Sequence, residues 1–220
     1  VPGSVAGLYE MHRRFGRLPW RDVVAPAIAL ARAHVVDNAR HNAIRRSEID
    51  LARFPTSAAV FLPGGVPPAA GDTLRQPDLA RTLGRIADRG ADGFYRGETA
   101  DLIVAEMRRS GGIITREDLT GYHALWRDPV QTTYRGWRVI GMPPSSSGGV
   151  TLTEILNILE GYELPAFGSA KLMHLEIEAM RRAFTDRNRF LGDPAFVEMP
   201  LDRLTSKGYA AGLREGISRR

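Results

Sequence analysis

The sequence predicts an α+β protein that is mainly helical. Over most of the chain, apolar residues recur every three or four positions, which is the spacing of amphipathic helices. Residues 129–142 have instead the aromatic and β-branched residues of two strands around a turn. No apolar run approaches the roughly 18 residues needed to span a bilayer, so a membrane span is not expected.

The N-terminal half is predicted to consist largely of helices. Their ranges are 4–16, 19–36, 37–54, 76–90 and 97–112. Pro26 is expected to kink the second helix, because proline removes a backbone donor and clashes with the preceding turn. The expected apolar face of this helix contains Val23, Ala27, Leu30 and Ala31. Residues 62–74 are rich in proline and glycine and are predicted to form an exposed loop.

The C-terminal half combines short local signals with longer helices. Thr115 and Asp118 have the spacing of a capping box, which predicts a short helix. The two predicted strands meet at a turn at Arg135 and Gly136. Further helices are expected over 149–163, 169–192 and within 200–216.

The segment "GMPPSSSGGV", residues 141–150, joins the second strand to the next helix and contains the candidate binding residues. These candidates are Ser145, Ser146, Ser147 and Gly148. The segment lacks both the Gly-x-Ser-x-Gly frame of a nucleophile elbow and the Gly-Lys-Ser/Thr ending of a phosphate loop. Two interpretations stay open: its amides form an anion-binding nest at the helix N-terminus, or its serines cap the helix in an ordinary turn.

Composition argues against several other functions. The formal net charge is +5, but the arginines are interspersed with acids and form no stripe, so no nucleic-acid partner is expected. Cysteine is absent, which excludes disulfides, thiolate metal sites and a cysteine nucleophile. His34 and His41, seven positions apart, could share one helix face, but no carboxylate completes a metal site with them. We therefore expect no metal and no cofactor.

A series of motifs in this order resembles the γ-glutamyltransferase (γ-glutamyltranspeptidase) family over nearly the whole chain. The motifs are "VPGSVAGLYE", "GDTLRQPDLARTL", "GADGFYRGETAD", "GGIITREDLTGY", "YRGWRVIGMPPSSSGG", "ILNILEGYEL" and "DRNRFLGDPAFVEMPLDRL". The resemblance implies a single region, residues 1–220, from the C-terminal part of the large subunit. It also implies part of the αββα fold of the N-terminal-nucleophile hydrolases.

The resemblance further implies an autoprocessed enzyme that transfers the γ-glutamyl group of glutathione or related compounds to water, amino acids or peptides. The catalytic threonine begins the small subunit, which is the expected partner, and the arginine that binds the substrate carboxylate precedes "VPG". No catalytic residue is therefore assigned among these 220 residues, and the chain alone is expected to be inactive. The alternatives are a related cephalosporin acylase-like amidohydrolase or a non-catalytic scaffold. The family suggests a periplasmic or extracellular location.

By the same resemblance, the segment 141–150 is expected to be a structural connection. Pro143 and Pro144 would direct the chain out of the strand, since proline cannot donate a ladder hydrogen bond. The serines would cap the next helix, and Gly148 and Gly149 would allow close approach of backbones.

Overall fold

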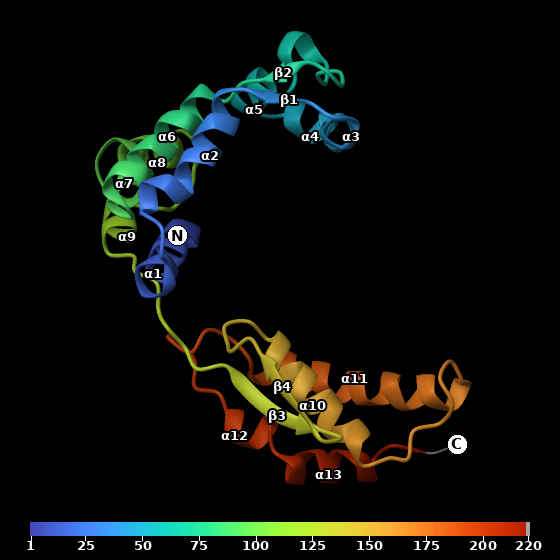
Figure 1. Ribbon diagram of the computed structural model, residues 1–220. Helices are drawn as coiled ribbons and strands as arrows, with labels where there is room; N and C mark the ends of the chain where they lie inside the picture. Colours follow the sequence, from blue (N-terminus) through green and yellow to red (C-terminus); the bar gives the residue numbers. More distant parts are fainter. Residues whose placement is uncertain (219–220) are drawn as a thin grey trace. The chain divides into compact units, whose positions relative to one another are not determined.

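The computed structural model describes residues 1–218, which fold as two compact units (Figure 1). Unit 1 comprises Val1–Leu125 and unit 2 comprises Trp126–Arg220. Sequence patterns did not indicate this division. The single region 1–220 expected from the motifs stays a prediction, and each unit is described here by itself.

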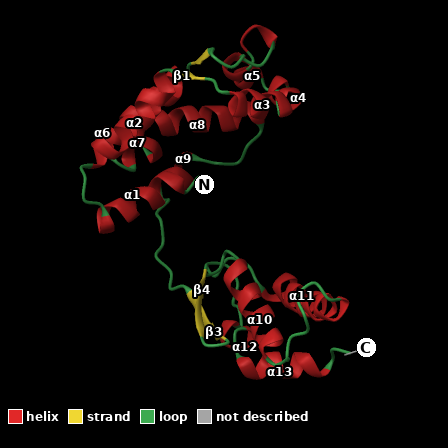
Figure 2. Ribbon diagram, turned by 45° about the vertical axis from the view of Figure 1, so that its right-hand side comes forward, coloured by secondary structure: helices red, strands yellow, loops and turns green. Residues whose placement is uncertain are grey.

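Unit 1 is built almost entirely from helices (Figure 2). These are α1 (Ser4–Phe15), α2 (Trp20–Arg32), α3 (Asn38–Arg46), α4 (Glu48–Ala52), α5 (Pro55–Phe61), α6 (Pro77–Arg89), α7 (Asp92–Tyr95), α8 (Gly97–Ser110) and α9 (Arg116–Thr120). A 3-10 turn occupies Pro63–Gly65. Two short antiparallel strands, β1 (His34–Val35) and β2 (Thr73–Leu74), pair His34 with Leu74 and Val35 with Thr73.

The core of unit 1 forms where α1, α7, α8 and α9 meet. Its buried residues are Ala6, Tyr95, Ala100, Val104 and Leu119. The Tyr95 hydroxyl accepts from the Ala6 amide at 3.2 Å and donates to the Pro2 carbonyl at 2.6 Å, so it fixes the start of α1. Burial of the ring raises the pKa of this hydroxyl.

The predicted capping box at α9 is confirmed. Thr115 Oγ1 accepts from the Asp118 amide at 3.1 Å, and Asp118 Oδ2 accepts from the Thr115 amide at 2.8 Å. Both hydrogen bonds satisfy donors that the first turn of a helix leaves unpaired. Hydrogen bonds from the Thr115 amide and hydroxyl lower the pKa of the Asp118 carboxyl.

Several local predictions for unit 1 are corrected by the structure. The predicted helix 37–54 is divided between α3 and α4 at Ser47. The predicted loop 62–74 ends in β2. This strand pairs with β1, which is distant in sequence, so the local sequence did not indicate it. His34 lies in β1 and His41 in α3, so they do not share a helix face. In α2, Val24 and Ala31 are buried, whereas Val23 and Leu30 are exposed.

Over residues 126–218, unit 2 combines one β-hairpin with four helices. Its elements are β3 (Val130–Tyr134), β4 (Trp137–Gly141), α10 (Gly148–Glu160), α11 (Ala170–Phe190), α12 (Leu201–Leu204) and α13 (Lys207–Glu215). The strands are antiparallel, and their register runs from the Val130–Gly141 pair to the Tyr134–Trp137 pair. The predicted strands and their turn are thus confirmed, as is the mainly helical α+β class.

The hairpin turn requires an unusual backbone conformation at both of its residues. The φ angle is 49° at Arg135 and 87° at Gly136, and a two-residue turn with two positive φ angles suits the right-handed twist of a hairpin. Arg135 is held in place by helix α10 and the loop after it. Its amide donates to Glu160 Oε1 at 2.7 Å, and its guanidinium donates to the Tyr162 carbonyl at 2.7 Å.

Helix α10 lies in the middle of unit 2 and contacts the hairpin, α11, α12 and α13 (Figure 1). Its core residues Ile158 and Leu159 pack with Leu175 and Ala179 of α11 and Ala210 of α13. Because α10 is enclosed on several sides, its polar residues are buried too. Thr151, Thr153, Glu154 and Asn157 all lie in the interior.

Candidate functional site

The predicted candidate residues Ser145, Ser146, Ser147 and Gly148 lie together in the loop from β4 to α10, which we call the serine loop (residues 142–149). Ser147 is the N-cap residue of α10, but its side chain makes no capping hydrogen bond. Instead, Ser146 Oγ accepts from the Gly148 amide at 3.3 Å. A serine therefore does bond the first helical amide, but it is not the serine at the N-cap position.

The two glycines of the loop have different surroundings. A Cβ atom at Gly149 would lie 2.2 Å from the Met142 carbonyl oxygen and 3.0 Å from the Gly141 carbonyl carbon. A Cβ atom at Gly148 would meet only Ser146 Oγ, at 3.6 Å. The expectation of close backbone approach is therefore confirmed for Gly149 and wrong for Gly148. At Gly149 the start of α10 packs directly against the end of β4.

Arg127 connects the serine loop to the segment after α11. Its Nη1 donates to the Pro144 carbonyl at 2.7 Å, and its Nη2 donates to Asp193 Oδ1 at 3.1 Å. Asp193 also accepts from the Ala195 amide at 3.0 Å. The Ala195 hydrogen bond and, next, the Arg127 hydrogen bond lower the pKa of the Asp193 carboxyl. One guanidinium thus joins two turns that are far apart in sequence.

A second arginine, Arg187 near the end of α11, reaches the same loop. Its Nε donates to Ser147 Oγ at 2.9 Å, and its Nη1 donates to Asn188 Oδ1 at 2.8 Å. Arg127 and Arg187 were not singled out from the sequence, where they are two of many arginines. No local pattern identifies them, because Arg127 bonds residues 17 and 66 positions away and Arg187 reaches Ser147 from 40 positions away.

These contacts show what the serine loop binds within its own chain. The Gly148 amide, which would be a donor in an anion nest, is occupied by Ser146 Oγ. The Ser147 hydroxyl accepts from Arg187, and the Pro144 carbonyl accepts from Arg127. The loop is therefore an internally bonded connection, positioned by two guanidinium groups.

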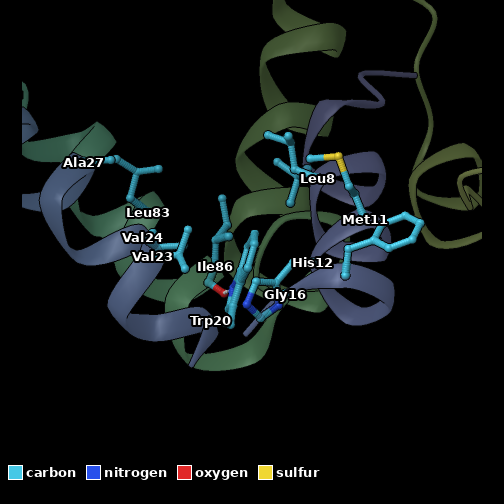
Figure 3. Close-up of a pocket in the computed structure, with 12 residues that line it drawn as sticks. Leu8, Met11, His12, Gly16, Trp20, Val23, Val24, Ala27, Leu83 and Ile86 are labelled. Carbon is cyan, nitrogen blue, oxygen red and sulfur yellow. Dashed lines mark hydrogen bonds between the residues drawn. The ribbon is translucent and has the colours of Figure 1, made fainter. Parts of the chain in front are cut away.

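A separate apolar cavity of about 570 Å³ lies in unit 1 between α1, α2 and α6 (Figure 3). Figure 3 shows Leu8 and Met11 on one side and Val23, Ala27 and Leu83 on the other. The polar atoms at its base are already engaged. His12 Nε2 lies 2.8 Å from the Leu18 carbonyl, and Trp20 Nε1 donates to the Ile86 carbonyl at 2.8 Å. The cavity therefore presents apolar surface and no reactive group.

Within residues 1–218, no cluster of His, Asp and Glu side chains is arranged to hold a metal ion. In the same range, no helix has both the length and the hydropathy needed to span a bilayer.

Comparison with known proteins relates the whole chain to one group of enzymes. The family model described as gamma-glutamyltranspeptidase matches residues 1–220. A glutathione hydrolase proenzyme of Pseudomonas sp. (strain A14) is 44% identical, with 99% of this chain and 39% of the relative covered. The Acylase ACY 1 proenzyme of Pseudomonas sp. (strain SE83) is 45% identical, with 96% of this chain and 38% of the relative covered. The chain thus spans about two fifths of the length of these relatives.

Solved structures agree with this relation. The gamma-glutamyltranspeptidase of Helicobacter pylori is 38% identical with a TM-score of 0.94, with 99% of this chain and 64% of that chain covered. The cephalosporin acylase of Bacillus halodurans is 32% identical with a TM-score of 0.90, covering 99% of this chain and 42% of that one. These neighbours confirm the predicted N-terminal-nucleophile hydrolase fold. The chain belongs to the gamma-glutamyltranspeptidase family.

Proposed function

We propose that this chain is the large-subunit portion of an enzyme that transfers the γ-glutamyl group of glutathione or a related compound. The acceptor is water, an amino acid or a peptide. The observation that carries this proposal is the match of the family model to all 220 residues. The proenzyme names of its relatives further support a precursor that is cleaved into two subunits.

The chemistry follows from the N-terminal threonine expected in the rest of the polypeptide. Its hydroxyl attacks the γ-carbonyl carbon while its own α-amino group accepts the proton. The C–N bond to the leaving amine breaks, that amine takes up the proton, and a γ-glutamyl ester remains on the threonine. Water or an acceptor amine then attacks the ester and frees the threonine. Thr115 and Thr151 are internal residues, so they lack the free α-amino group that this step needs.

The contribution of the present chain to this reaction is structural. Both units leave large apolar side chains exposed, including Leu102 on α8 and Met173 and Ile177 on α11. On β4, Trp137 is 77% exposed and Ile140 is 58% exposed. The β3–β4 hairpin is a two-stranded sheet, and such a sheet has unpaired edges that pair readily with further strands. These features support the small subunit of the same precursor as the partner of this chain.

For the serine loop we propose the connecting role. Ser146 bonds Gly148, Ser147 bonds Arg187, and Arg127 holds Pro144. These bonds use the loop's polar groups within the protein. Ser146, Ser147 and Gly148 are therefore proposed as positions that set the geometry between β4 and α10 rather than as ligand contacts. Ser145 takes part in none of these bonds, and we propose no ligand contact for it either.

A second candidate activity is the hydrolysis of an amide side chain by a cephalosporin acylase-like enzyme. It is favoured by the acylase relative, whose 45% identity to this chain is as high as that of the glutathione hydrolases. Both activities use the same kind of acyl-threonine intermediate, so the large-subunit fold serves either. The acyl group that is accepted distinguishes them.

The test is an assay of the complete polypeptide that contains this chain. The purified, processed protein is given γ-glutamyl-p-nitroanilide and, in parallel, an acyl-cephalosporin, with and without an acceptor dipeptide. We expect release of p-nitroaniline that the dipeptide accelerates. The 220 residues alone, taken through the same purification, provide the control and are expected to be inactive. Turnover of the acyl-cephalosporin alone would replace the first proposal by the second, and turnover of neither by a processed protein would refute both.

A further inference from the structure

A carboxyl group is buried in the centre of unit 2. Glu154 lies on α10, between the hairpin and α11, and only 1% of its surface is exposed. One of its oxygens, Oε1, is buried without a hydrogen-bond partner. A buried ionised carboxylate without a partner is costly, because it loses its hydration and gains nothing in return.

The Asp186 carboxyl, on the neighbouring helix α11, lies within hydrogen-bonding reach of Glu154. Asp186 of α11 is also buried, and its Oδ2 accepts a 2.6 Å hydrogen bond from the Tyr209 hydroxyl of α13. The charge of Arg203, on α12, works in the opposite direction and favours lower pKa values for both Glu154 and Tyr209. Its guanidinium lies 5.0 Å from the centre of the Tyr209 ring and 4.8 Å from that of Phe190. Among the described residues, none on β3 or β4 shifts the pKa of Glu154.

We propose that Glu154 and Asp186 share one proton in the folded protein, and that this proton links α10 to α11. With the proton on Glu154, its carboxyl becomes a donor to Asp186, which supplies the partner that the buried carboxyl lacks. Loss of the proton leaves two carboxylates in the interior, while the nearby Arg203 side chain is exposed.

The direction of the pKa shift supports this arrangement. Burial, then the charge of Asp186, then a hydrogen bond to its side chain raise the pKa of Glu154 from 4.5 to about 8. The folded protein therefore holds the proton more tightly than the unfolded chain. The stability that the proton contributes is complete below pH 4.5, falls as the pH rises, and is lost above about pH 8. Unit 2 thus contains an alkali-sensitive contact.

The test compares the complete polypeptide with its Glu154→Gln variant. Glutamine retains a donor toward Asp186 but cannot ionise. Urea unfolding is measured at several pH values from 5 to 9, followed by hydrogen exchange of amides in α10 and α11. We expect the unfolding constant of the wild type, divided by that of the variant, to rise by up to about tenfold per pH unit and to level off above pH 8.

Glu160→Gln is the matched control on the same helix. Hydrogen bonds from Lys207 and Arg135 lower the pKa of Glu160, so this carboxyl is ionised throughout the range. The unfolding constant of the wild type, divided by that of Glu160→Gln, should therefore stay constant from pH 6 to 9.

The infrared spectrum of the wild type gives a second measurement that needs no folded variant. It should show a protonated buried carboxyl at pH 6 that disappears above pH 8. A ratio for Glu154→Gln that does not change with pH, or the absence of the protonated carboxyl signal at pH 6, would overturn the shared proton. Neither result bears on the γ-glutamyl activity, so the two proposals fail separately.

Discussion

Units 1 and 2 differ in what they bury. Apart from tyrosine, Thr99 is the one buried polar side chain among the described residues of unit 1, whereas unit 2 buries Thr151, Thr153, Glu154, Asn157 and Asp186. Unit 1 also contains the apolar cavity bounded by α1, α2 and α6. Apolar packing therefore dominates unit 1, and a central helix with specific polar contacts organises unit 2.

This difference has a physical consequence. Apolar packing is non-directional and tolerates sliding of helices, whereas a buried hydrogen bond is satisfied in one geometry. Asn157 illustrates the second case. Its amide nitrogen donates to the Thr205 carbonyl at 2.8 Å, and its Oδ1 accepts from Thr132 Oγ1 at 3.2 Å. One side chain thereby sets the position of α10 relative to β3 and the end of α12.

The largest expected effect tests the tight packing of unit 2. Gly149→Ala places a methyl group 2.2 Å from the Met142 carbonyl oxygen, so β4 and α10 must separate. We expect a loss of about 3 kcal/mol in the free energy of unfolding. In unit 1, Gly84 of α6 has no atom within 4 Å of the equivalent position. Gly84→Ala should stabilise by about 0.5–1 kcal/mol. Equal changes in the free energy of unfolding for the two variants, measured in urea, would contradict the proposed difference between the units.

The next effect tests the buried polar contacts. Asn157→Leu retains the number and branching of the side-chain heavy atoms but leaves the Thr205 carbonyl and the Thr132 hydroxyl without this partner. We expect a loss of about 2 kcal/mol. The counterpart in unit 1 is Thr99→Val, which removes bonds to the Gly93 carbonyl and the Arg85 side chain. A greater loss for Thr99→Val, measured by thermal and urea unfolding, would reverse the comparison.

A smaller effect is expected at the capping box of unit 1. Thr115→Ala removes the hydroxyl that accepts from the Asp118 amide, and loss of an N-cap costs about 1 kcal/mol. Thr115→Ser retains the hydroxyl, so this variant should have nearly the stability of the wild type. Hydrogen exchange should place the change in α9. Loss of hydrogen-exchange protection mainly in α10 would instead show that a change in unit 1 destabilises unit 2.

The smallest effects are expected in the serine loop. Ser146→Ala and Ser147→Ala each remove one hydrogen bond, so each should cost at most about 1 kcal/mol. Ser145→Ala is the matched control, because Ser145 is exposed and its side chain makes no hydrogen bond among the described residues. In the complete enzyme, turnover should remain within a few-fold of the wild type. A drop of a hundredfold or more with an unchanged melting temperature is expected of a lost transition-state donor, and would show that the loop contacts the reacting group.

Much of the local structure could be predicted from neighbouring residues. The capping box at Thr115 and the turn at Arg135 and Gly136 depend on contacts a few positions apart, and both are confirmed. The ordered motifs also predicted the family, since they extend over nearly the whole chain. The prediction was less accurate where a helix pattern continued across Ser47, because periodicity does not register a short break.

Tertiary structure decided the contacts between distant residues. Periodicity did not predict that α2 would bury Val24 rather than Val23, because the position of α6 selects that face. It did not predict that Arg127 and Arg187 would hold the serine loop, or that Glu154 would face Asp186. The local sequence determines which segments become helices and strands, since those hydrogen bonds form between near neighbours. The partners of long side chains depend on how the assembled elements pack, which no single stretch of sequence contains.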